Sequence, residues 1–247
     1  MPDSVGTRAK LGVIIPSTNT VVEHDLYAVR PEGITFHFGR MYIEAPDLSS
    51  DDAFEALLGQ VRESITVAIR DVMTCEPDYL VMGMSAETFW GGKAGGEEFV
   101  RKVREQSGLE CSTGAAACED AIAALGLKRI AVLTPYQPVG DEQVRGFFGE
   151  LGVEIVRLHG LKCPSATSIA RITEAEVLPI LRELDGPDVD AIVQVGTNLS
   201  FVRLADEAER WLGKPVVAIN AATLWHALRA NGFQDRFTGF GPLLRDH

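Results

Sequence analysis

The chain lacks any apolar run of the length that a membrane-spanning helix requires, which is about 20 residues. Its first residues, Met1-Pro2-Asp3-Ser4, contain no basic segment followed by an apolar stretch, as a secretory signal would. We therefore expect a cytoplasmic protein that makes no contact with a membrane. Apolar residues still make up 46% of the chain, which is enough for a buried core.

Positively charged side chains are scarce: 23 lysines and arginines stand against 35 aspartates and glutamates, for a formal net charge of −12. Nucleic-acid binding depends on lysine and arginine side chains that neutralise phosphates, so this balance argues against a nucleic-acid partner. It does not exclude a small anionic ligand, because main-chain N–H groups and hydroxyls hold anions locally.

The usual signatures of metal and cofactor sites are missing. The five histidines are scattered and the four cysteines show no CxxC spacing, so we expect free thiols and no metal. No GxGxxG segment follows an expected strand, and no GxxxxGK segment is present, so we expect no dinucleotide, nucleoside triphosphate or other cofactor. A GxSxG segment is absent too, which argues against an α/β-hydrolase triad.

Short apolar runs alternate with longer amphipathic stretches along the whole chain. The runs are continuous and bounded by turn residues, which is typical of parallel strands covered on both faces. This alternation predicts an α/β fold. The expected strands are 11–16, 79–84, 130–133, 191–195 and 216–219, and the expected helices are 51–74, 97–106, 115–125, 142–151, 200–212 and 223–230.

The second half of the chain repeats the order of the first. LGVIIPSTNT (11–20) is echoed by IAVLTPYQPV (130–139), and DYLVMGMS is echoed later by DAIVQVGTN. We therefore expect two pseudo-symmetric, Rossmann-like units with parallel sheets and an active site in the cleft between them. The first lobe is expected to comprise 1–112 and 220–247, and the second 113–219.

Polar residues directly follow four of the expected strands. Asn19 and Ser85 come after strands of the first half, and Tyr136 and Thr197 come after strands of the second. In open α/β sheets, ligands lie beyond the carboxyl ends of the strands. Two facing halves would bring these side chains into one cleft, where hydroxyl, amide and main-chain N–H groups can hold an anion.

Three features beside these loops allow more than one interpretation. Thr197 and Asn198 either bind the ligand or cap the next helix. The glycine-rich run at 91–96 is expected to be a mobile loop, with a lid over the cleft as the alternative. Phe89 and Trp90 either form an apolar wall of the site or belong to the core.

Several of these segments resemble one known group of enzymes. PSTNT (16–20) is similar to the loop that opens maleate isomerases, and MGMS (82–85) resembles the Met-Gly-Thr-Ser loop of arylmalonate decarboxylase. GTNL (196–199), with LGKPV and LWHALR further on, resembles the C-terminal third of maleate isomerases. The likeness extends over about 11–243, so the chain resembles the maleate isomerases and arylmalonate decarboxylases of the aspartate/glutamate racemase superfamily.

The resemblance implies a reaction on a small carboxylic acid without cofactor or metal. Family members place catalytic cysteines after the central strands of the two halves, and these positions are Gly83 and Gly196 here. We expect an isomerase or decarboxylase that forms an enediolate-like intermediate and assembles as a homo-oligomer. The resemblance assigns catalysis to Tyr136 and Ser85, and substrate binding to Asn19, Gly83, Met84, Gly196, Thr197, Asn198 and Cys163.

The missing family cysteines leave a second interpretation open, in which the chain binds a dicarboxylate or related metabolite without converting it. Cys75, Cys111 and Cys118 are expected to pack like small apolar residues. Cys163 lies near the position where the family has a substrate-contacting loop, and the ammonium group of Lys162 would lower its thiol pKa and make it reactive.

Overall fold

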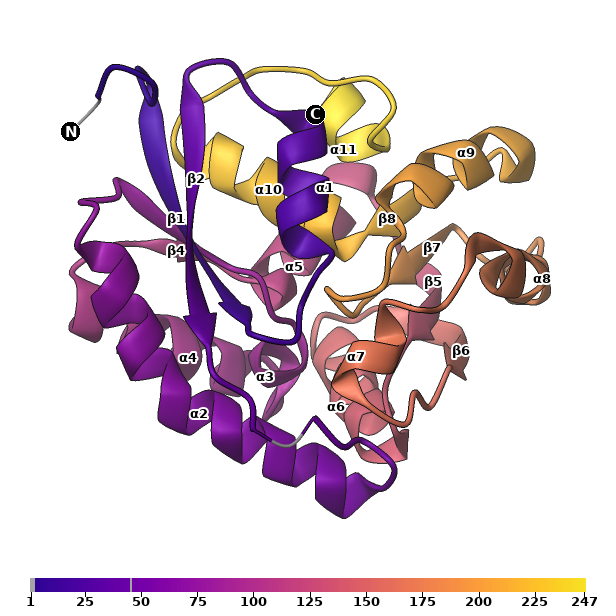
Figure 1. Ribbon diagram of the computed structural model, residues 1–247. Helices are drawn as coiled ribbons and strands as arrows, with labels where there is room; N and C mark the ends of the chain where they lie inside the picture. Colours follow the sequence, from indigo (N-terminus) through magenta and orange to yellow (C-terminus); the bar gives the residue numbers. More distant parts are fainter. Residues whose placement is uncertain (1–2, 45) are drawn as a thin grey trace.

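Two four-stranded sheets form the centre of the computed structural model, which describes residues 3–44 and 46–247 (Figure 1). The first sheet, in the order β2-β1-β3-β4, contains β1 (Ala9–Pro16), β2 (Ile34–Met41), β3 (Tyr79–Met82) and β4 (Cys111–Ser112). The second, in the order β6-β5-β7-β8, contains β5 (Arg129–Thr134), β6 (Glu154–Gly160), β7 (Ala191–Gln194) and β8 (Val216–Ala218).

Every paired strand in both sheets runs parallel to its neighbour, and the second sheet repeats the strand order of the first. The predicted α/β fold of two related parallel-sheet units is therefore confirmed. The helices are α1 (Val22–Val29), α2 (Asp51–Met73), α3 (Ala86–Phe89), α4 (Gly92–Ser107), α5 (Gly114–Leu125), α6 (Pro138–Glu150), α7 (Ala166–Ile169), α8 (Glu174–Leu184), α9 (Val202–Leu212), α10 (Ile219–Ala230) and α11 (Pro242–Asp246).

The central strands β1 and β5 are buried almost from end to end. In β1, Leu11 pairs in register with Phe36 of β2 on one side and with Tyr79 of β3 on the other. A strand that is covered on both faces needs apolar residues at successive positions rather than at alternate ones. This requirement explains why the central strands were visible in the sequence as continuous apolar runs.

The edge strands β2 and β6 were not predicted. β2 carries His37 and Arg40 between its buried residues, and β6 is only half-buried along most of its length. An edge strand has a neighbour on one side alone and therefore tolerates polar residues. The apolar run that marks a central strand is broken in both.

The glycine-rich run at 91–96 is not a loop, so that prediction was wrong: α4 begins at Gly92. A Cβ on Gly95 would lie 2.0 Å from the carbonyl oxygen of Trp90, and one on Gly96 would lie 3.0 Å from that of Thr88. The glycines therefore allow the start of α4 to pack directly against the end of α3. They serve close packing rather than mobility.

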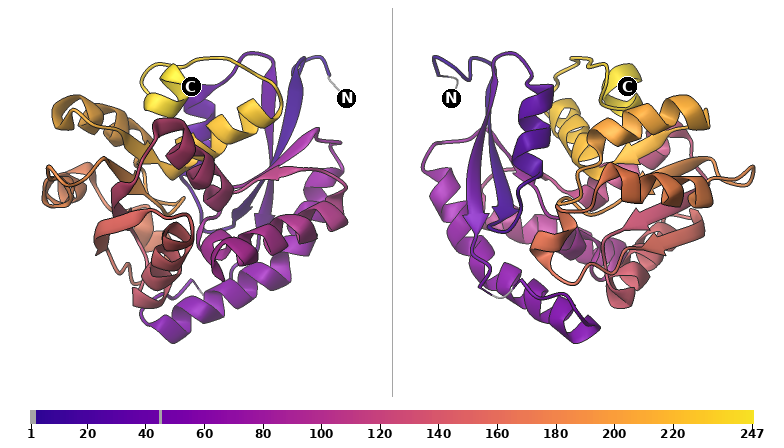
Figure 2. Two further views of the ribbon diagram at one scale, coloured as in Figure 1. Left: turned by 180° about the vertical axis from the view of Figure 1, so that it is seen from behind. Right: turned by 45° about the vertical axis from the view of Figure 1, so that its right-hand side comes forward.

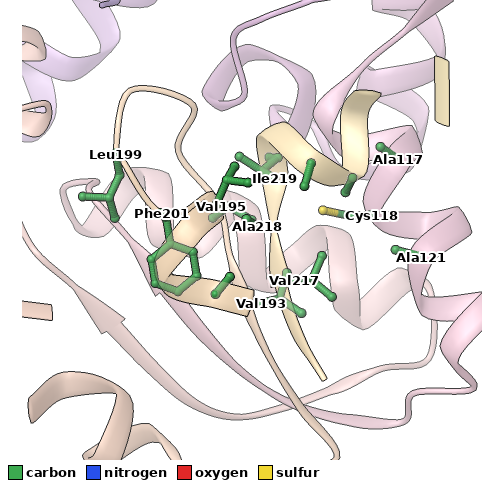
Figure 3. Packing of buried hydrophobic residues seen from close by; sticks show 14 of the residues in the cluster. Ala117, Cys118, Ala121, Val193, Val195, Leu199, Phe201, Val217, Ala218 and Ile219 are labelled. Carbon is green, nitrogen blue, oxygen red and sulfur yellow. The ribbon is translucent and has the colours of Figure 1, made fainter. Parts of the chain in front are cut away.

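Each half of the chain contributes a helix to the other half. α10, which follows the last strand of the second sheet, contacts β3, β4 and α1 of the first unit. In the opposite direction, Cys118 of α5 belongs to the same buried cluster as Val217 and Ile219 (Figure 3). From this exchange of helices we propose that the first lobe comprises 1–112 and 220–247 and that the second comprises 113–219.

The long helix α2 lies against both units. It contacts β1, β2 and α4 of the first unit and α6 of the second, and it runs along the lower edge of the molecule in Figures 1 and 2. Ser50 caps its start by accepting a hydrogen bond from the Ala53 N–H. One helix thus supplies side chains to the space between the sheets.

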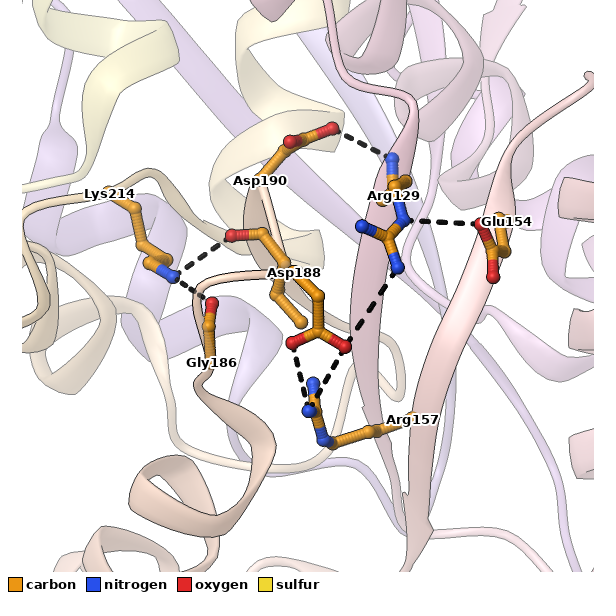
Figure 4. A network of polar contacts seen from close by, with 8 residues as sticks. Arg129, Glu154, Arg157, Gly186, Asp188, Asp190 and Lys214 are labelled. Atoms are coloured by element: carbon orange, nitrogen blue, oxygen red, sulfur yellow. Dashed lines mark hydrogen bonds and ion pairs between the residues drawn. The ribbon is translucent and has the colours of Figure 1, made fainter.

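A network of ion pairs fastens the amino ends of the second sheet (Figure 4). Arg129 at the start of β5 pairs with Glu154 at the start of β6, and Asp188 in the loop before β7 pairs with Arg157 at 2.9 Å. Lys214 donates to two carbonyl oxygens of the same loop. These pairs are partly exposed and contribute modestly to stability.

Within the described residues, no helix combines the length and the apolar character needed to span a membrane.

Candidate functional site

The loops after β1, β3, β5 and β7 meet between the two sheets. Each contributes at least one buried polar side chain, and Asn19, Ser85, Tyr136 and Thr197 come from the four loops in that order. The four line one cavity of about 80 Å³, and Met84, Gly196 and Asn198 line it too. The structure therefore brings together every residue predicted for the site except Cys163 and Gly83, whose carbonyl oxygen accepts a hydrogen bond from the lining residue Thr197.

Ser85 and Tyr136 form the shortest contact across the cavity. Their hydroxyl oxygens are 2.6 Å apart, and the Thr197 N–H donates to Ser85 Oγ at 3.2 Å. Burial raises the pKa of Tyr136 well above its usual value, against the smaller opposing effect of the hydrogen bond with Ser85. The phenol therefore keeps its proton at neutral pH and is available as a hydrogen-bond donor.

Asn19 and Thr197 connect the two units through their side chains. Asn19 Nδ2 donates to Thr197 Oγ1 at 3.3 Å, and Thr197 Oγ1 donates to the carbonyl oxygen of Gly83 at 3.2 Å. Asn19 Oδ1 accepts hydrogen bonds from the N–H groups of Val21 and Val22, which fixes the loop between β1 and α1. These side chains are thus held in place before any ligand binds.

Asn198 also holds loops together. Its Oδ1 accepts a hydrogen bond from the Thr20 N–H at 3.0 Å, and its Nδ2 donates to the carbonyl oxygen of Ala166 at 2.8 Å. It does not cap the next helix, because α9 begins at Val202 after Phe201, with no side-chain cap. The capping interpretation is therefore wrong for both Thr197 and Asn198.

Met84 and Ser85, which line the cavity, also carry main-chain donors. The N–H groups of Met84 and Ser85 have no hydrogen-bond partner among the described residues. Together with the Tyr136 hydroxyl they offer several neutral donors to one anion, an arrangement that stabilises negative charge on oxygen. Among the described residues, no lysine, arginine or histidine lines the cavity.

Gly83 and Gly196, the positions where the resemblance places cysteines, are tightly enclosed. A Cβ on Gly83 would lie 2.4 Å from Ile15 Cγ2. Gly196 has a φ of 117°, and a Cβ there would lie 2.4 Å from Cδ of Pro135. Residues other than glycine rarely adopt such a φ, so a cysteine in place of Gly196 would require a local rearrangement of the main chain.

None of the four cysteines lines the cavity, and all are free thiols. The main chain of Cys163 supports the site, because its N–H donates to the carbonyl oxygen of Pro135 at 3.1 Å. Burial raises the pKa of its thiol to about 11, so the lowered pKa expected from the neighbouring Lys162 is wrong. Burial likewise raises the pKa of the Cys111 and Cys118 thiols to about 12.

The other side of the cavity is apolar, and its residues were missed in the sequence. Phe54, Leu57, Leu58 and Val61 of α2 line it, and Ile169 of α7 completes the wall. In the sequence these α2 residues show only the ordinary apolar face of an amphipathic helix. Of the two interpretations of Phe89 and Trp90, the wall of the site is wrong: Phe89 is fully buried against Phe147, and Trp90 stacks on Phe54 without lining the cavity.

Glu87 was missed as well. It lies in α3, two residues after Ser85, and is the one charged side chain among the lining residues. No sequence motif marks it.

In the described part of the chain, no group of three or more histidine, cysteine, aspartate or glutamate side chains is arranged to hold a metal ion.

Comparisons with known proteins agree with this geometry. Residues 11–244 match the family described as arylmalonate decarboxylase. A maleate isomerase of Pseudomonas putida is 26% identical over 246 residues, covering 95% of this chain and 96% of the relative. The arylmalonate decarboxylase of Bordetella bronchiseptica is 30% identical over 166 residues, covering 66% of this chain and 69% of the relative.

Two solved structures share the fold. One is a variant of the Nocardia farcinica maleate cis-trans isomerase with a covalently bound succinylcysteine intermediate, with a TM-score of 0.86, 24% identity and coverage of 96% of this chain and 98% of that one. The other is a variant of arylmalonate decarboxylase in its liganded form, with a TM-score of 0.83, 22% identity and coverage of 96% and 99%.

Proposed function

The chain belongs to the arylmalonate decarboxylase family, and on that premise we propose that it decarboxylates or isomerises a small carboxylic acid through an enediolate-like intermediate, without a cofactor. One observation carries the proposal: side chains from four different strand ends surround one cavity, with Ser85 and Tyr136 in direct contact. Neutral, fixed donors of this kind suit an intermediate whose negative charge lies on carboxyl oxygens.

The substrate would lie with one carboxylate at the donors and its hydrocarbon part against α2. Tyr136, Ser85 and the free N–H groups of Met84 and Ser85 then hold the carboxylate that becomes the enediolate. A fixed donor of this kind typically contributes about 3–4 kcal/mol to the transition state. Thr197 already holds the Ser85 hydroxyl through its N–H, so little reorganisation of this donor accompanies the reaction.

The apolar wall favours decarboxylation over isomerisation. Maleate and the arylmalonates are both dicarboxylic acids, and a second carboxylate placed against Phe54, Leu57 and Leu58 would lose its hydration. Loss of hydration destabilises a charged carboxylate relative to neutral CO2. An apolar substituent, such as the aryl group of an arylmalonate, would also pack there, whereas maleate has none.

We propose that this chemistry proceeds without a cysteine at the substrate. The cysteines lie away from the cavity, and the enclosed backbone at Gly83 and Gly196 has no room for a thiol. A succinylcysteine intermediate, as found in the Nocardia farcinica variant, would therefore not form here. The proton must move through another group.

A direct assay tests the proposal. The purified chain is incubated separately with phenylmalonate and with maleate, and the products are followed by proton NMR. We expect phenylacetate from phenylmalonate and little or no fumarate from maleate. Fumarate as the main product would shift the assignment to isomerisation, and no product from either acid would contradict the proposal.

The cysteine-free cavity also motivates a second candidate, in which the chain binds such an acid without converting it. Thermal denaturation with the same two acids separates the candidates. A bound acid raises the melting temperature in both cases, because it binds the folded state alone. A clear rise without any product would favour the binding protein, and product formation rules it out.

A further inference from the structure

The carboxylate of Glu87 is in an unusual position for a charged side chain. Glu87 lines the candidate active site and retains only 12% of its side-chain exposure, whereas its ion-pair partner Arg62 on α2 retains 50%. Surface ion pairs usually expose both partners and contribute little. Here the carboxylate of Glu87 is largely buried, whereas the side chain of Arg62 is exposed.

The two oxygens of Glu87 are not equivalent. Oε1 accepts a hydrogen bond from Arg62 Nε at 2.7 Å. Oε2 is buried and has no hydrogen-bond partner among the described residues. A pair that only joined α2 to α3 would satisfy both oxygens, as a bidentate arginine–carboxylate pair does. Leaving a buried carboxylate oxygen unpaired is costly, and such groups cluster at functional sites.

No other lining side chain is suited to exchange a proton at neutral pH. Burial keeps the Tyr136 phenol protonated, the cysteines lie elsewhere, and the serine, threonine and asparagine side chains do not titrate in this range. An enediolate nevertheless needs a proton on carbon before product can leave. Glu87 is the one carboxyl group at the cavity.

We propose that Glu87 is the catalytic acid–base of this site, with its free Oε2 exchanging a proton with the α-carbon of the substrate. This inference rests on the proposed function. In decarboxylation, the bond to the leaving carboxylate breaks, CO2 departs, and the electron pair remains in the enediolate. The protonated Glu87 then gives its proton to the α-carbon and a C–H bond forms. Water returns a proton to Glu87, and the hydroxide left behind combines with the released CO2 to give bicarbonate.

A second cavity explains how water reaches Glu87. A groove of about 640 Å³ between α2 and α4 is lined by Arg62 and Phe99, among others, and it shares Glu87 and Val61 with the active-site cavity. Glu87 therefore stands in the wall between the buried site and the groove. Arg62, which holds Oε1 from the groove side, is a positioning residue.

The test compares Glu87→Gln with the wild type and with Glu63→Gln, a control at an exposed glutamate beside Arg62 on α2. Glutamine keeps an oxygen for the Arg62 hydrogen bond but cannot exchange a proton. With phenylmalonate, we expect Glu87→Gln to lower kcat by about 100-fold to 10,000-fold with little change in KM. Glu63→Gln should retain wild-type turnover.

A second measurement does not depend on turnover. Binding of malonate is followed by calorimetry in two buffers with different ionisation enthalpies, which reports protons taken up on binding. The proposed role requires a proton on Glu87 when an acid is bound, so the wild type should take up a proton that Glu87→Gln does not. Glu87→Asp, which retains a titratable group, should keep the proton uptake even if Glu87→Gln fails to fold.

The outcomes separate the inference from the proposed function. Wild-type turnover of phenylmalonate by Glu87→Gln, or equal proton uptake in both proteins, would overturn the role of Glu87 and leave the proposed function standing. A wild-type chain that neither converts phenylmalonate nor binds malonate would overturn both.

Discussion

Tyr136 shows how burial selects the chemistry of a single side chain. Its ring packs against Phe54, whose ring centroid lies 5.4 Å away, and within the described part of the chain its hydroxyl contacts only that of Ser85. In this setting the phenolate form is disfavoured, so the hydroxyl acts as a donor rather than as a base. Its contribution to catalysis is therefore expected to be the stabilisation of charge on oxygen.

Replacing Tyr136 with phenylalanine should lower turnover sharply while preserving the packing. We expect kcat to fall by about 100-fold to 1,000-fold, the usual effect of removing one oxyanion donor. Tyr79→Phe is the matched control, because Tyr79 is also buried and its hydroxyl lies 3.1 Å from Ser112 Oγ, away from the cavity. Equal turnover in wild type and Tyr136→Phe would remove Tyr136 from the mechanism.

Gly196 is expected to tolerate no side chain. Gly196→Ala would place a Cβ on the Pro135 ring at a φ of 117°, and we expect a loss of at least about 2 kcal/mol in the free energy of unfolding. Gly59→Ala is the contrasting control, since Gly59 lies inside α2 with open space around it, and alanine there should stabilise the helix by about 1 kcal/mol. Urea denaturation of both variants checks the difference.

Among single residues, the sequence predicted the hydroxyl and amide side chains of the candidate site better than the carboxylate of Glu87. Asn19, Ser85, Tyr136 and Thr197 each follow a strand directly, so the rule for parallel sheets was sufficient to place them near one another. Glu87 lies inside the short helix α3, and its environment depends on α2, which is distant in sequence. No local pattern carries that information.

Among the elements, α1 and α10 are joined by a buried polar contact that supports the site from behind. Asn220 of α10 donates to Asp25 of α1 at 2.7 Å and to the carbonyl oxygen of Thr197 at 3.0 Å. Burial raises the pKa of Asp25 from 3.8 to about 6, although the hydrogen bond from Asn220 opposes the shift. Through Asn220, the loop that carries Thr197 is therefore connected to the Asp25 carboxyl group, whose pKa is raised.

Asp25→Asn should change how stability depends on pH. The folded protein holds the Asp25 proton more tightly than the unfolded chain does. Its contribution is therefore complete below pH 3.8 and is lost as the pH rises through about 6. Relative to the variant, the wild type should lose about 2 kcal/mol of unfolding free energy between pH 4 and pH 7.

Melting temperatures measured across that pH range test this prediction. Asp141, whose pKa burial also raises to about 6, titrates in both proteins, so the difference between them reports Asp25 alone. Parallel curves for wild type and Asp25→Asn would show that Asp25 does not titrate in this range.

The elements differ in how visible they were in the sequence, and the reason is burial. β1, β3, β5, β7 and β8 are apolar throughout their middle and were predicted. β2 and β6 lie at sheet edges and carry polar residues, whereas β8 at the other edge of the second sheet is buried and apolar. The glycines of α4 were read as a loop because their packing against α3 is a tertiary property.

At the scale of the whole molecule, the two units are held together by α2 and by the site itself. Phe54 of α2 packs against Tyr136 of the second unit and against Trp90 of the first. Ser85 and Thr197 hydrogen-bond across the same boundary. Folding stability and the geometry of the site therefore share several contacts.

Phe54→Ala should consequently reduce both stability and activity. We expect a loss of about 3–5 kcal/mol in unfolding free energy from the cavity that it leaves, and a lower kcat because Tyr136 loses its support. Val67→Ala on the same helix is the control, since Val67 is 46% exposed and should change little. Full activity in a destabilised Phe54→Ala would show that the two properties are independent.

The described residues that line the cavity include no lysine, arginine or histidine, and this has a kinetic consequence for a protein whose formal net charge is −12. A dianionic substrate approaches against the long-range field of the whole molecule, and dissolved ions screen that repulsion over about 10 Å at an ionic strength of 0.1 M. Added sodium chloride should therefore accelerate capture of a dianion, as kcat/KM measured from low to moderate ionic strength would show, whereas enzymes that attract their substrates electrostatically slow down.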